Sequence, residues 1–309
     1  MRLDKYLNEK LDFSRNQLSN LIKNGLVKVN GKIITKPSFK VNENDNVEYE
    51  TKTFEEKEEY EVDFDVEIIY EDDDILIINK PSGLVIHPAP SVKEATLVDW
   101  LKSKNITLST ISGEERHGIV HRIDKETTGA LVIAKNNESH EFLSKQLQDK
   151  TMGRIYLAII DIPLKDNCEI DRPIARNPKN RLKQAVVLSG RDAKTRFLKL
   201  CGEKEELIAC KLFTGRTHQI RVHLNSINRH ILGDELYGAK ASEDRVMLHA
   251  YILYLIHPKT KEKMFFKAPL FADMENKIKT ICKEDIYEKF NENYIISEFD
   301  NFNDYRLCE

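Results

Sequence analysis

The feature that most constrains this chain is the stretch of residues 51–66 (TKTFEEKEEYEVDFDV), which is acidic and poor in aliphatic side chains. Such a segment cannot bury enough apolar surface to fold by itself, so we expect it to connect two folded units. The chain has 309 residues, and a domain usually has about 100–200. We therefore predict a small domain at 1–57, a linker at 58–66, a larger domain at 67–273 and an acidic, aromatic tail at 274–309.

The charged residues are segregated along the chain, although the net charge is only -3. Residues 1–40 hold nine Lys/Arg against three Asp/Glu, and residues 172–200 hold nine against one. Residues 41–75 hold sixteen Asp/Glu against two Lys. Two basic islands in an acidic chain are what a surface that follows nucleic-acid phosphates needs. Chance clustering of solvated lysines gives the same pattern, so charge alone leaves nucleic-acid binding open.

Nothing in the sequence indicates a membrane or an oxidising compartment. No run approaches the roughly 20 apolar residues that cross a bilayer, and the N-terminus lacks the apolar region of a secretory signal. The five cysteines are scattered and form no CxxC pair, which argues against a disulfide framework and against a zinc site. We therefore expect a soluble cytoplasmic protein with reduced thiols.

The first fifty residues have the pattern of a small α+β module. Apolar residues recur at helical spacing over 3–11 and again over 18–22. Asn30-Gly31 lies between two short runs of alternating apolar residues, which predicts a hairpin with a type I′ turn.

This helix–helix–hairpin pattern resembles the S4 RNA-binding domain. The resemblance rests on residues 2–7 (RLDKYL), 14–18 (SRNQL) and 25–32 (GLVKVNGK). A helical oligomerisation cap is the alternative reading. The resemblance implies RNA-phosphate contacts from four basic residues: Arg15, Lys23, Lys28 and Lys32.

One candidate for chemistry is the segment His121–Gly129 (HRIDKETTG). Asp124 precedes a hydroxyl-rich glycine turn, after which the apolar run 130–134 continues as a buried type of strand. A carboxylate at the rim of such a strand, with Arg122 close by, suits a nucleophile or a base that must stay ionised. Asp beside Thr and Gly is also a common turn cap, so these residues alone do not decide.

A second candidate is Leu212–Leu224 (LFTGRTHQIRVHL). Thr217 can cap the helix that follows the Thr-Gly turn, and Arg216 with the helix N-terminus can hold an anion. Arg221 falls one turn into that helix, where it can pair with a carboxylate from another segment. The two histidines of the segment are five residues apart and no HExxH is present, so we predict no metal site.

Taken together, these segments resemble RluA-type (RluA/RluC/RluD) pseudouridine synthases over about residues 64–272. Departures from the family's pattern are small, among them Arg154 where Lys is frequent and Ile123 where Leu is frequent. The motifs that carry the resemblance follow the family's order: residues 70–74 (YEDDD), 79–88 (NKPSGLVIHP), 121–129, 155–158 (IYLA), 214–224, 233–238 (GDELYG) and 248–250 (LHA).

The resemblance implies an α+β protein. A pseudouridine synthase fold, with a mixed and mostly antiparallel sheet flanked by helices, would follow a small S4-type domain. The spacing of the strand-like runs agrees, because several lie close enough along the chain to pair antiparallel.

The implied reaction isomerises uridine in RNA to pseudouridine and needs no cofactor and no metal. Asp124 would be the catalytic aspartate, and Arg221 would be its salt-bridge partner. Tyr156 would stack on the target base and help to remove the C5 proton. Attack of Asp124 on C1′ and removal of the 2′ proton both remain open. Substrate binding would fall to Arg122 (extrusion of the uridine), Arg216 (anion binding) and Leu224 (an apolar wall).

The expected partner is RNA, and we expect the protein itself to be a monomer that binds no membrane. An S4 domain before the catalytic domain is typical of the branch that acts on large-subunit (23S) ribosomal RNA. Transfer RNA is the alternative substrate. An RNA-binding assembly factor with a vestigial catalytic fold is a different class of function, which the presence of Asp124, Tyr156 and Arg221 disfavours.

Overall fold

The computed structural model describes residues 1–11, 13, 15–42, 44–50, 60–89, 92–111, 117–239, 243–282, 291–300 and 306–307. The chain divides into two compact units, Met1–Glu61 and Val62–Glu309. Each unit has a hydrophobic core made of its own residues. The linker prediction for 58–66 falls partly on residues 58–59, which lie outside the described residues.

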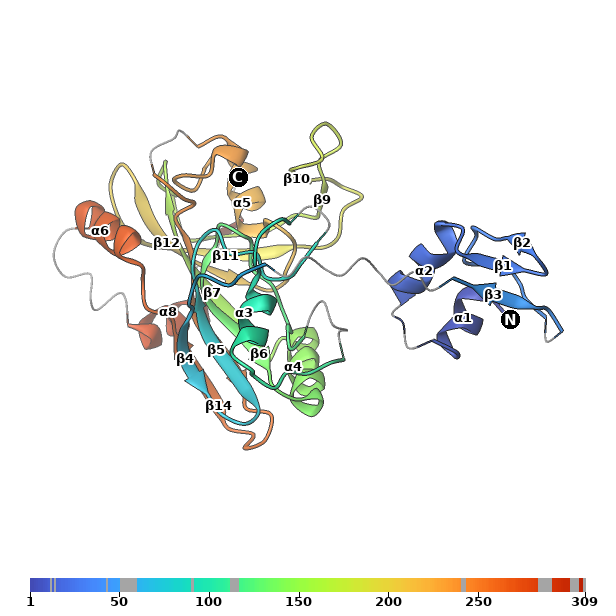
Figure 1. Cartoon of the computed structure of the whole chain (residues 1–309). Helices are drawn as coiled ribbons and strands as arrows, with labels where there is room; N and C mark the ends of the chain where they lie inside the picture. Colours follow the sequence, from blue (N-terminus) through green and yellow to red (C-terminus); the bar gives the residue numbers. More distant parts are fainter. Residues whose placement is uncertain are drawn as a thin grey trace. The chain divides into compact units, whose positions relative to one another are not determined.

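The N-terminal unit combines two helices with a small antiparallel sheet (Figure 1). Its core includes Leu3, Leu7 and Leu18, which are fully buried. Both residues of the predicted type I′ turn have positive φ, 51° at Asn30 and 77° at Gly31. The elements are α1 (Leu3–Asn8), α2 (Arg15–Lys23), β1 (Val27–Val29), β2 (Lys32–Ile33) and β3 (Val47–Tyr49), with the strands in the order β2-β1-β3.

The second unit is built on a ten-stranded sheet in the order β15-β8-β11-β12-β7-β13-β6-β5-β4, with β14 paired to β13. Only β6 with β13 and β8 with β15 pair in parallel among the described strands, so the predicted mixed, mostly antiparallel sheet is confirmed. The strands are β4 (Glu67–Glu71), β5 (Ile75–Lys80), β6 (Thr128–Ala134), β7 (Gly153–Ile160), β8 (Cys168–Asp171), β11 (Lys194–Cys201), β12 (Glu206–Leu212), β13 (Leu248–Ile256), β14 (Lys263–Lys267) and β15 (Arg306–Leu307). A separate two-stranded hairpin, β9 (Ile174–Arg176) with β10 (Gln184–Val186), projects from the body (Figure 1).

Both faces of the central strands are covered, which explains why β5 reads as an unbroken apolar run. Successive side chains of a strand point to opposite faces of the sheet. Leu76 and Ile78 therefore enter one hydrophobic cluster, while Ile75 and Ile77 enter another. The helices of this unit are α3 (Leu97–Ser103), α4 (Asn137–Asp149), α5 (Gln219–Asn225), α6 (Ala272–Ile281), α8 (Glu292–Asp300) and the 3-10 helix η2 (Glu235–Tyr237).

The described part of the C-terminal tail folds onto the second unit. Met274 and Ile278 of α6 and Ile295 and Phe299 of α8 are buried in the main core. The strand β15 extends the sheet beside β8. Among the described aromatic residues of the tail, Phe299 and Tyr294 pack against the core, a role that their spacing in the sequence did not reveal.

The prediction of reduced thiols was wrong for three of the cysteines. Cys201 and Cys282 form a disulfide with Cα atoms 5.5 Å apart, and Cys168 is also disulfide-bonded. Cys201 and Cys282 are 81 residues apart in the sequence and meet only because α6 returns to the end of β11. Cys210 is free and buried.

Gly129 allows β6 to approach β13. A Cβ atom at this position would lie 2.3 Å from the carbonyl oxygen of Ala250, and its φ is +108°. We expect Gly129→Ala to lower the free energy of unfolding by about 3 kcal/mol or more, measured by urea denaturation.

Gly83→Ala is the matched control, because Gly83 also has a positive φ (+80°) but open space around its Cβ position. It should lose only the conformational cost of about 1–2 kcal/mol. Equal losses in the two variants would show that the close approach of the strands is unimportant.

Candidate active site

A cavity of about 660 Å³ in the second unit is lined by residues of α4, β7 and α5 and by the loops that precede β6 and α5. Five cationic side chains line it, Arg122, Lys125, Arg154, Arg216 and Arg221. Asp124 is the only carboxylate among the described lining residues. The cavity therefore presents one negative charge within a positive wall, which suits an anionic ligand that reacts at Asp124.

Asp124 lies in the loop that leads into β6. The loop turns tightly, with the amide of Thr127 donating to the carbonyl of Asp124 at 3.1 Å. The carboxylate itself remains 22% exposed, in contrast to the fully buried strand that follows. The turn-cap reading is therefore insufficient, since the side chain faces the cavity and an arginine.

Arg221 places its guanidinium between two carboxylates. Its Nη1 lies 3.6 Å from Oδ2 of Asp124, while Nε and Nη2 donate to the two oxygens of Asp234 at 2.7 Å each. Burial lowers the pKa of Arg221, but hydrogen bonds and charge from Asp234, and charge from Asp124, outweigh it and raise the pKa overall. The predicted pairing of Arg221 with Asp124 is present, as the longer of the two contacts.

Asp234 is a site residue that the sequence analysis quoted in a motif without giving it a role. It is 1% exposed, so its bidentate contact with Arg221 is made away from water. The same G-D-x-x-Y-G motif supplies Tyr237, whose ring lies 5.1 Å from the guanidinium of Arg221. The sequence signal that could have identified Asp234 is its place as the acidic residue between the two glycines of the motif 233–238.

Tyr156 comes from β7, and its side chain reaches the same cavity. The residue is 4% exposed. Burial raises the pKa of Tyr156 while the nearby charge of Arg154 partly opposes that effect, so the phenol is neutral near pH 7. The three predicted catalytic residues therefore border one cavity.

Comparison with known proteins agrees with this geometry. Residues 74–226 match the family described as RNA pseudouridylate synthase, and residues 1–47 match the S4 domain. An uncharacterized RNA pseudouridine synthase of Helicobacter pylori (strain J99) is 45% identical over 312 residues, which cover 96% of this chain and 95% of that protein. This chain is an RluA-family pseudouridine synthase with an N-terminal S4 domain.

Further relatives are more distant. The ribosomal large subunit pseudouridine synthase D of Zymomonas mobilis is 38% identical over 290 residues, covering 89% of this chain and 92% of that protein. The solved structure of human RNA Pseudouridylate Synthase Domain Containing 1 has the same fold, with a TM-score of 0.54 and 20% identity over 70% of this chain and 94% of that one. The pseudouridine synthase described here is thus an isomerase that acts on RNA.

Lys80 of this pseudouridine synthase binds the loop that carries Asp124. This lysine received no role in the sequence analysis. It is fully buried, and its ammonium donates to the carbonyls of Pro81, Leu84 and Lys125 at 2.7–2.9 Å. Burial lowers the pKa of Lys80 to about 7, whereas three carbonyl acceptors match the three N–H groups of the charged form. We take Lys80 to be protonated in the folded protein, because a neutral amine has two N–H groups and would leave one of the three carbonyls without a donor.

The predicted substrate-binding residues are only partly brought together. Arg122 lines the cavity, with Nη1 3.4 Å from Nε2 of His87, and Arg216 lines it while its Nε donates to the carbonyl of Asp192. Leu224 is fully buried in the core and does not line the cavity. The apolar wall predicted for Leu224 comes instead from residues such as Ile123 and Leu248.

The turn before α5 also differs from the expectation. His218, in a left-handed conformation, is the N-cap, so Thr217 does not cap the helix. The side chain of Gln219 accepts from the amide of Arg216 at 3.0 Å, and α5 is only seven residues long. The predicted contribution of the helix N-terminus to an anion site is therefore not supported, and Arg216 is the residue of that prediction that lines the cavity.

The lysines predicted to contact RNA lie in the N-terminal unit. Lys23 and Lys32 are exposed, while Lys28 is half-buried with Nζ 3.9 Å from Glu50. Arg15 begins α2, and its side chain lies outside what the structure describes.

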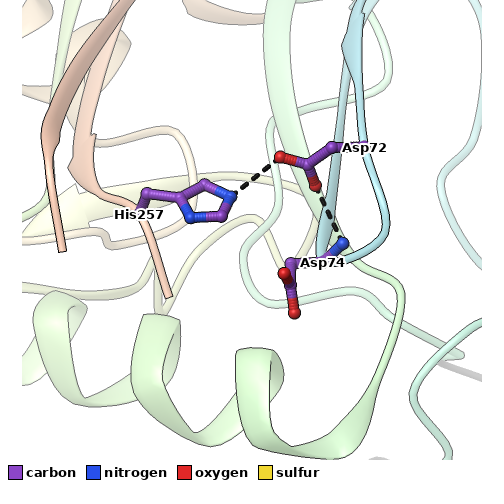
Figure 2. A group of neighbouring side chains, drawn as sticks. All are labelled: Asp72, Asp74 and His257. Atoms are coloured by element: carbon purple, nitrogen blue, oxygen red, sulfur yellow. Dashed lines mark hydrogen bonds and ion pairs between the residues drawn. The ribbon is translucent and has the colours of Figure 1, made fainter. Parts of the chain in front are cut away.

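One group of described residues, Asp72, Asp74 and His257, has spacing suited to a metal ion (Figure 2). Nδ1 of His257 accepts from the amides of Lys259 and Thr260, so Nε2 carries the proton and donates to Asp72 at 2.8 Å. Asp72 also accepts from the amide of Asp74. These bonds fasten the β4–β5 turn to the turn after β13, which explains the group without a metal.

No helix in the described part of the chain is long and apolar enough to cross a membrane.

Removing the charge of Asp234 should disturb both stability and catalysis. Asp234→Asn leaves the buried guanidinium of Arg221 with one good acceptor, so we expect a loss of about 3 kcal/mol in the free energy of unfolding. Isomerisation at saturating RNA should fall by roughly a hundredfold as Arg221 shifts from Asp124. Urea denaturation and single-turnover rates measure the two effects.

Asp273→Asn is the control, because Asp273 makes an equivalent two-oxygen contact with Arg245 but is 44% exposed. Although the Arg245 side chain is 9% exposed, the Asp273 carboxylate stays in contact with water, so its substitution should cost less than that of Asp234, about 1 kcal/mol. If both variants behaved alike, the buried position of the Asp234–Arg221 pair would have no special importance.

Proposed function

We propose that this enzyme isomerises uridines of large-subunit ribosomal RNA, with Asp124 as the catalytic carboxylate. Support for the RNA class comes from the N-terminal S4 domain and from relatives named ribosomal large subunit pseudouridine synthase D, at 36–38% identity. The observation that carries the catalytic assignment is the single carboxylate of the cavity, held beside a buried arginine.

The reaction breaks the C1′–N1 bond, forms a C1′–C5 bond and moves a proton from C5 to N1. Asp124 starts it either by attacking C1′ or by removing the 2′ proton, and both routes need an ionised carboxylate. The contact with Arg221 stabilises that charge and orients the carboxylate toward the sugar. The atoms and electrons of this isomerisation balance without an oxidant, a group donor or a metal.

The remaining site residues act on the base. Tyr156, buried in the wall of the cavity, stacks on the uracil and assists removal of the C5 proton. Arg122, exposed at the rim, supports extrusion of the uridine, since chemistry on a stacked base requires flipping it out.

The β9–β10 hairpin supplies a basic surface near the site. Residues 172–191 contain no acidic residue, and Arg176, Lys179, Arg181 and Arg191 are exposed without an acidic partner among the described residues. The hairpin reaches the site through the amide of Gln184, which donates to the hydroxyl of Tyr237 at 2.8 Å. RNA phosphates held there would lie next to the residues that orient Arg221.

The test maps pseudouridine in ribosomal and transfer RNA from cells that lack the protein, then from cells that express wild type or Asp124→Asn. Wild type should restore specific sites in large-subunit ribosomal RNA, and Asp124→Asn, which keeps the side-chain volume but loses the charge, should restore none. Restoration in transfer RNA alone would overturn the proposed substrate. Turnover by Asp124→Asn would overturn the role of the carboxylate.

The N-terminal unit should contribute affinity rather than chemistry. Each RNA phosphate that this unit neutralises adds roughly 0.7–0.9 to the steepness with which the logarithm of the affinity falls with the logarithm of the salt concentration. Removing residues 1–61 should therefore raise KM and reduce the slope of log affinity against log salt concentration by a few units. The kcat should stay nearly unchanged. An unaltered salt slope would show that this unit does not contact the RNA.

A further inference from the structure

Arg154 is a cation in the wall of the cavity that no carboxylate of the described residues neutralises. It lies in β7 two residues before Tyr156, so both side chains point to the same face of the strand and both line the cavity. Among the residues that the structure describes, no acidic group lies within ion-pair distance of Arg154. Its Nε is buried and has no hydrogen-bond partner.

Among the described residues, the guanidinium makes one polar side-chain contact, to a histidine whose other ring nitrogen already has a partner. Nη1 of Arg154 lies 3.3 Å from Nδ1 of His121, while the amide of Val132 lies 3.3 Å from Nε2 of the same ring. Burial and the charge of Arg154 lower the pKa of His121 well below its usual range, so the ring is neutral. A neutral imidazole has one acceptor nitrogen, and it cannot accept from both donors.

The outer side of the guanidinium is open to a ligand. The nearest atom to the position of a Cβ on Gly215 is Nη2 of Arg154, at 3.4 Å, and no other atom outside the immediate chain neighbours lies within 4 Å. Gly215 also lines the cavity, next to Arg216. The glycine thus keeps clear a space bordered by two guanidinium-bearing residues.

We propose that Arg154 binds a backbone phosphate of the RNA adjacent to the extruded uridine, a role that rests on the proposed action on RNA. A partly buried guanidinium that borders a cavity and lacks a carboxylate partner among the described residues favours an anionic ligand, and a phosphate is the anion that an RNA chain brings into this cavity. Uracil itself is neutral and cannot supply that charge. The planar fork of arginine matches two phosphate oxygens, which an ammonium at this position would not.

The experiment compares wild type with Arg154→Gln on the RNA that wild type modifies, and on the same RNA with a neutral methylphosphonate at either phosphate flanking the target uridine. For wild type, one of the two neutral linkages should lower kcat/KM by roughly tenfold to a hundredfold, the range of a hydrogen bond to a charged group. Arg154→Gln should lose a similar factor on unmodified RNA. Neutralising the phosphate should cost that variant little more, because the interaction is already gone.

Two further variants keep the outcome interpretable. Gly215→Ala places a methyl group in the open space at an ordinary contact distance and should reduce kcat/KM without lowering the unfolding midpoint. Arg229→Gln is the matched control, because Arg229 is also a partly buried arginine with an unpaired Nε but lies outside the cavity lining. It should retain the full sensitivity to the methylphosphonate.

Independent, multiplicative losses from Arg154→Gln and from each methylphosphonate would overturn the assignment to Arg154. So would a wild-type enzyme that is indifferent to both neutral linkages. Failure of wild type to modify any RNA would instead contradict the proposed function itself, which separates the two claims.

Discussion

The candidate active site depends on one buried arginine held between two carboxylates. Asp234 accepts from Nε and Nη2 along one edge of the Arg221 guanidinium at 2.7 Å, and Asp124 lies 3.6 Å from the remaining nitrogen, Nη1. An arginine that is 5% exposed would be costly without such compensation. The tight partner is the fully enclosed Asp234, so the looser and more exposed Asp124 remains available to the substrate.

This arrangement links segments that are far apart in the chain. Asp124 precedes β6, Arg221 belongs to α5, and Asp234 precedes η2. Lys80 at the end of β5 holds the Asp124 loop through the carbonyl of Lys125, and Tyr237 links Arg221 to the basic β9–β10 hairpin. A change in any of these elements would therefore reach the Asp124 carboxylate through a short series of hydrogen bonds, ion pairs and one cation–π contact.

The sequence predicted the elements of the fold and three residues that border the cavity better than it predicted their partners. Asp124, Tyr156 and Arg221 lie in local motifs, so pattern and resemblance were sufficient to propose them, and the structure brings them to one cavity. Asp234 and Lys80 act through contacts made only when distant strands and turns meet, which no local pattern encodes. The role predicted for Leu224 was wrong because an apolar side chain fits a core position as well as a pocket wall, and Leu224 lies in the core. The disulfide of Cys201 depends likewise on the return of α6 to β11.

The central claim is that Arg221 acts by pairing with both carboxylates at once, and not merely by carrying positive charge. Single-turnover isomerisation by Arg221→Lys, on saturating RNA, tests it most directly, because lysine keeps the charge but cannot present a planar fork to two partners. The account predicts a rate lower by roughly a hundredfold, with RNA affinity nearly unchanged. A folded Arg221→Lys enzyme with a rate close to that of wild type would contradict it.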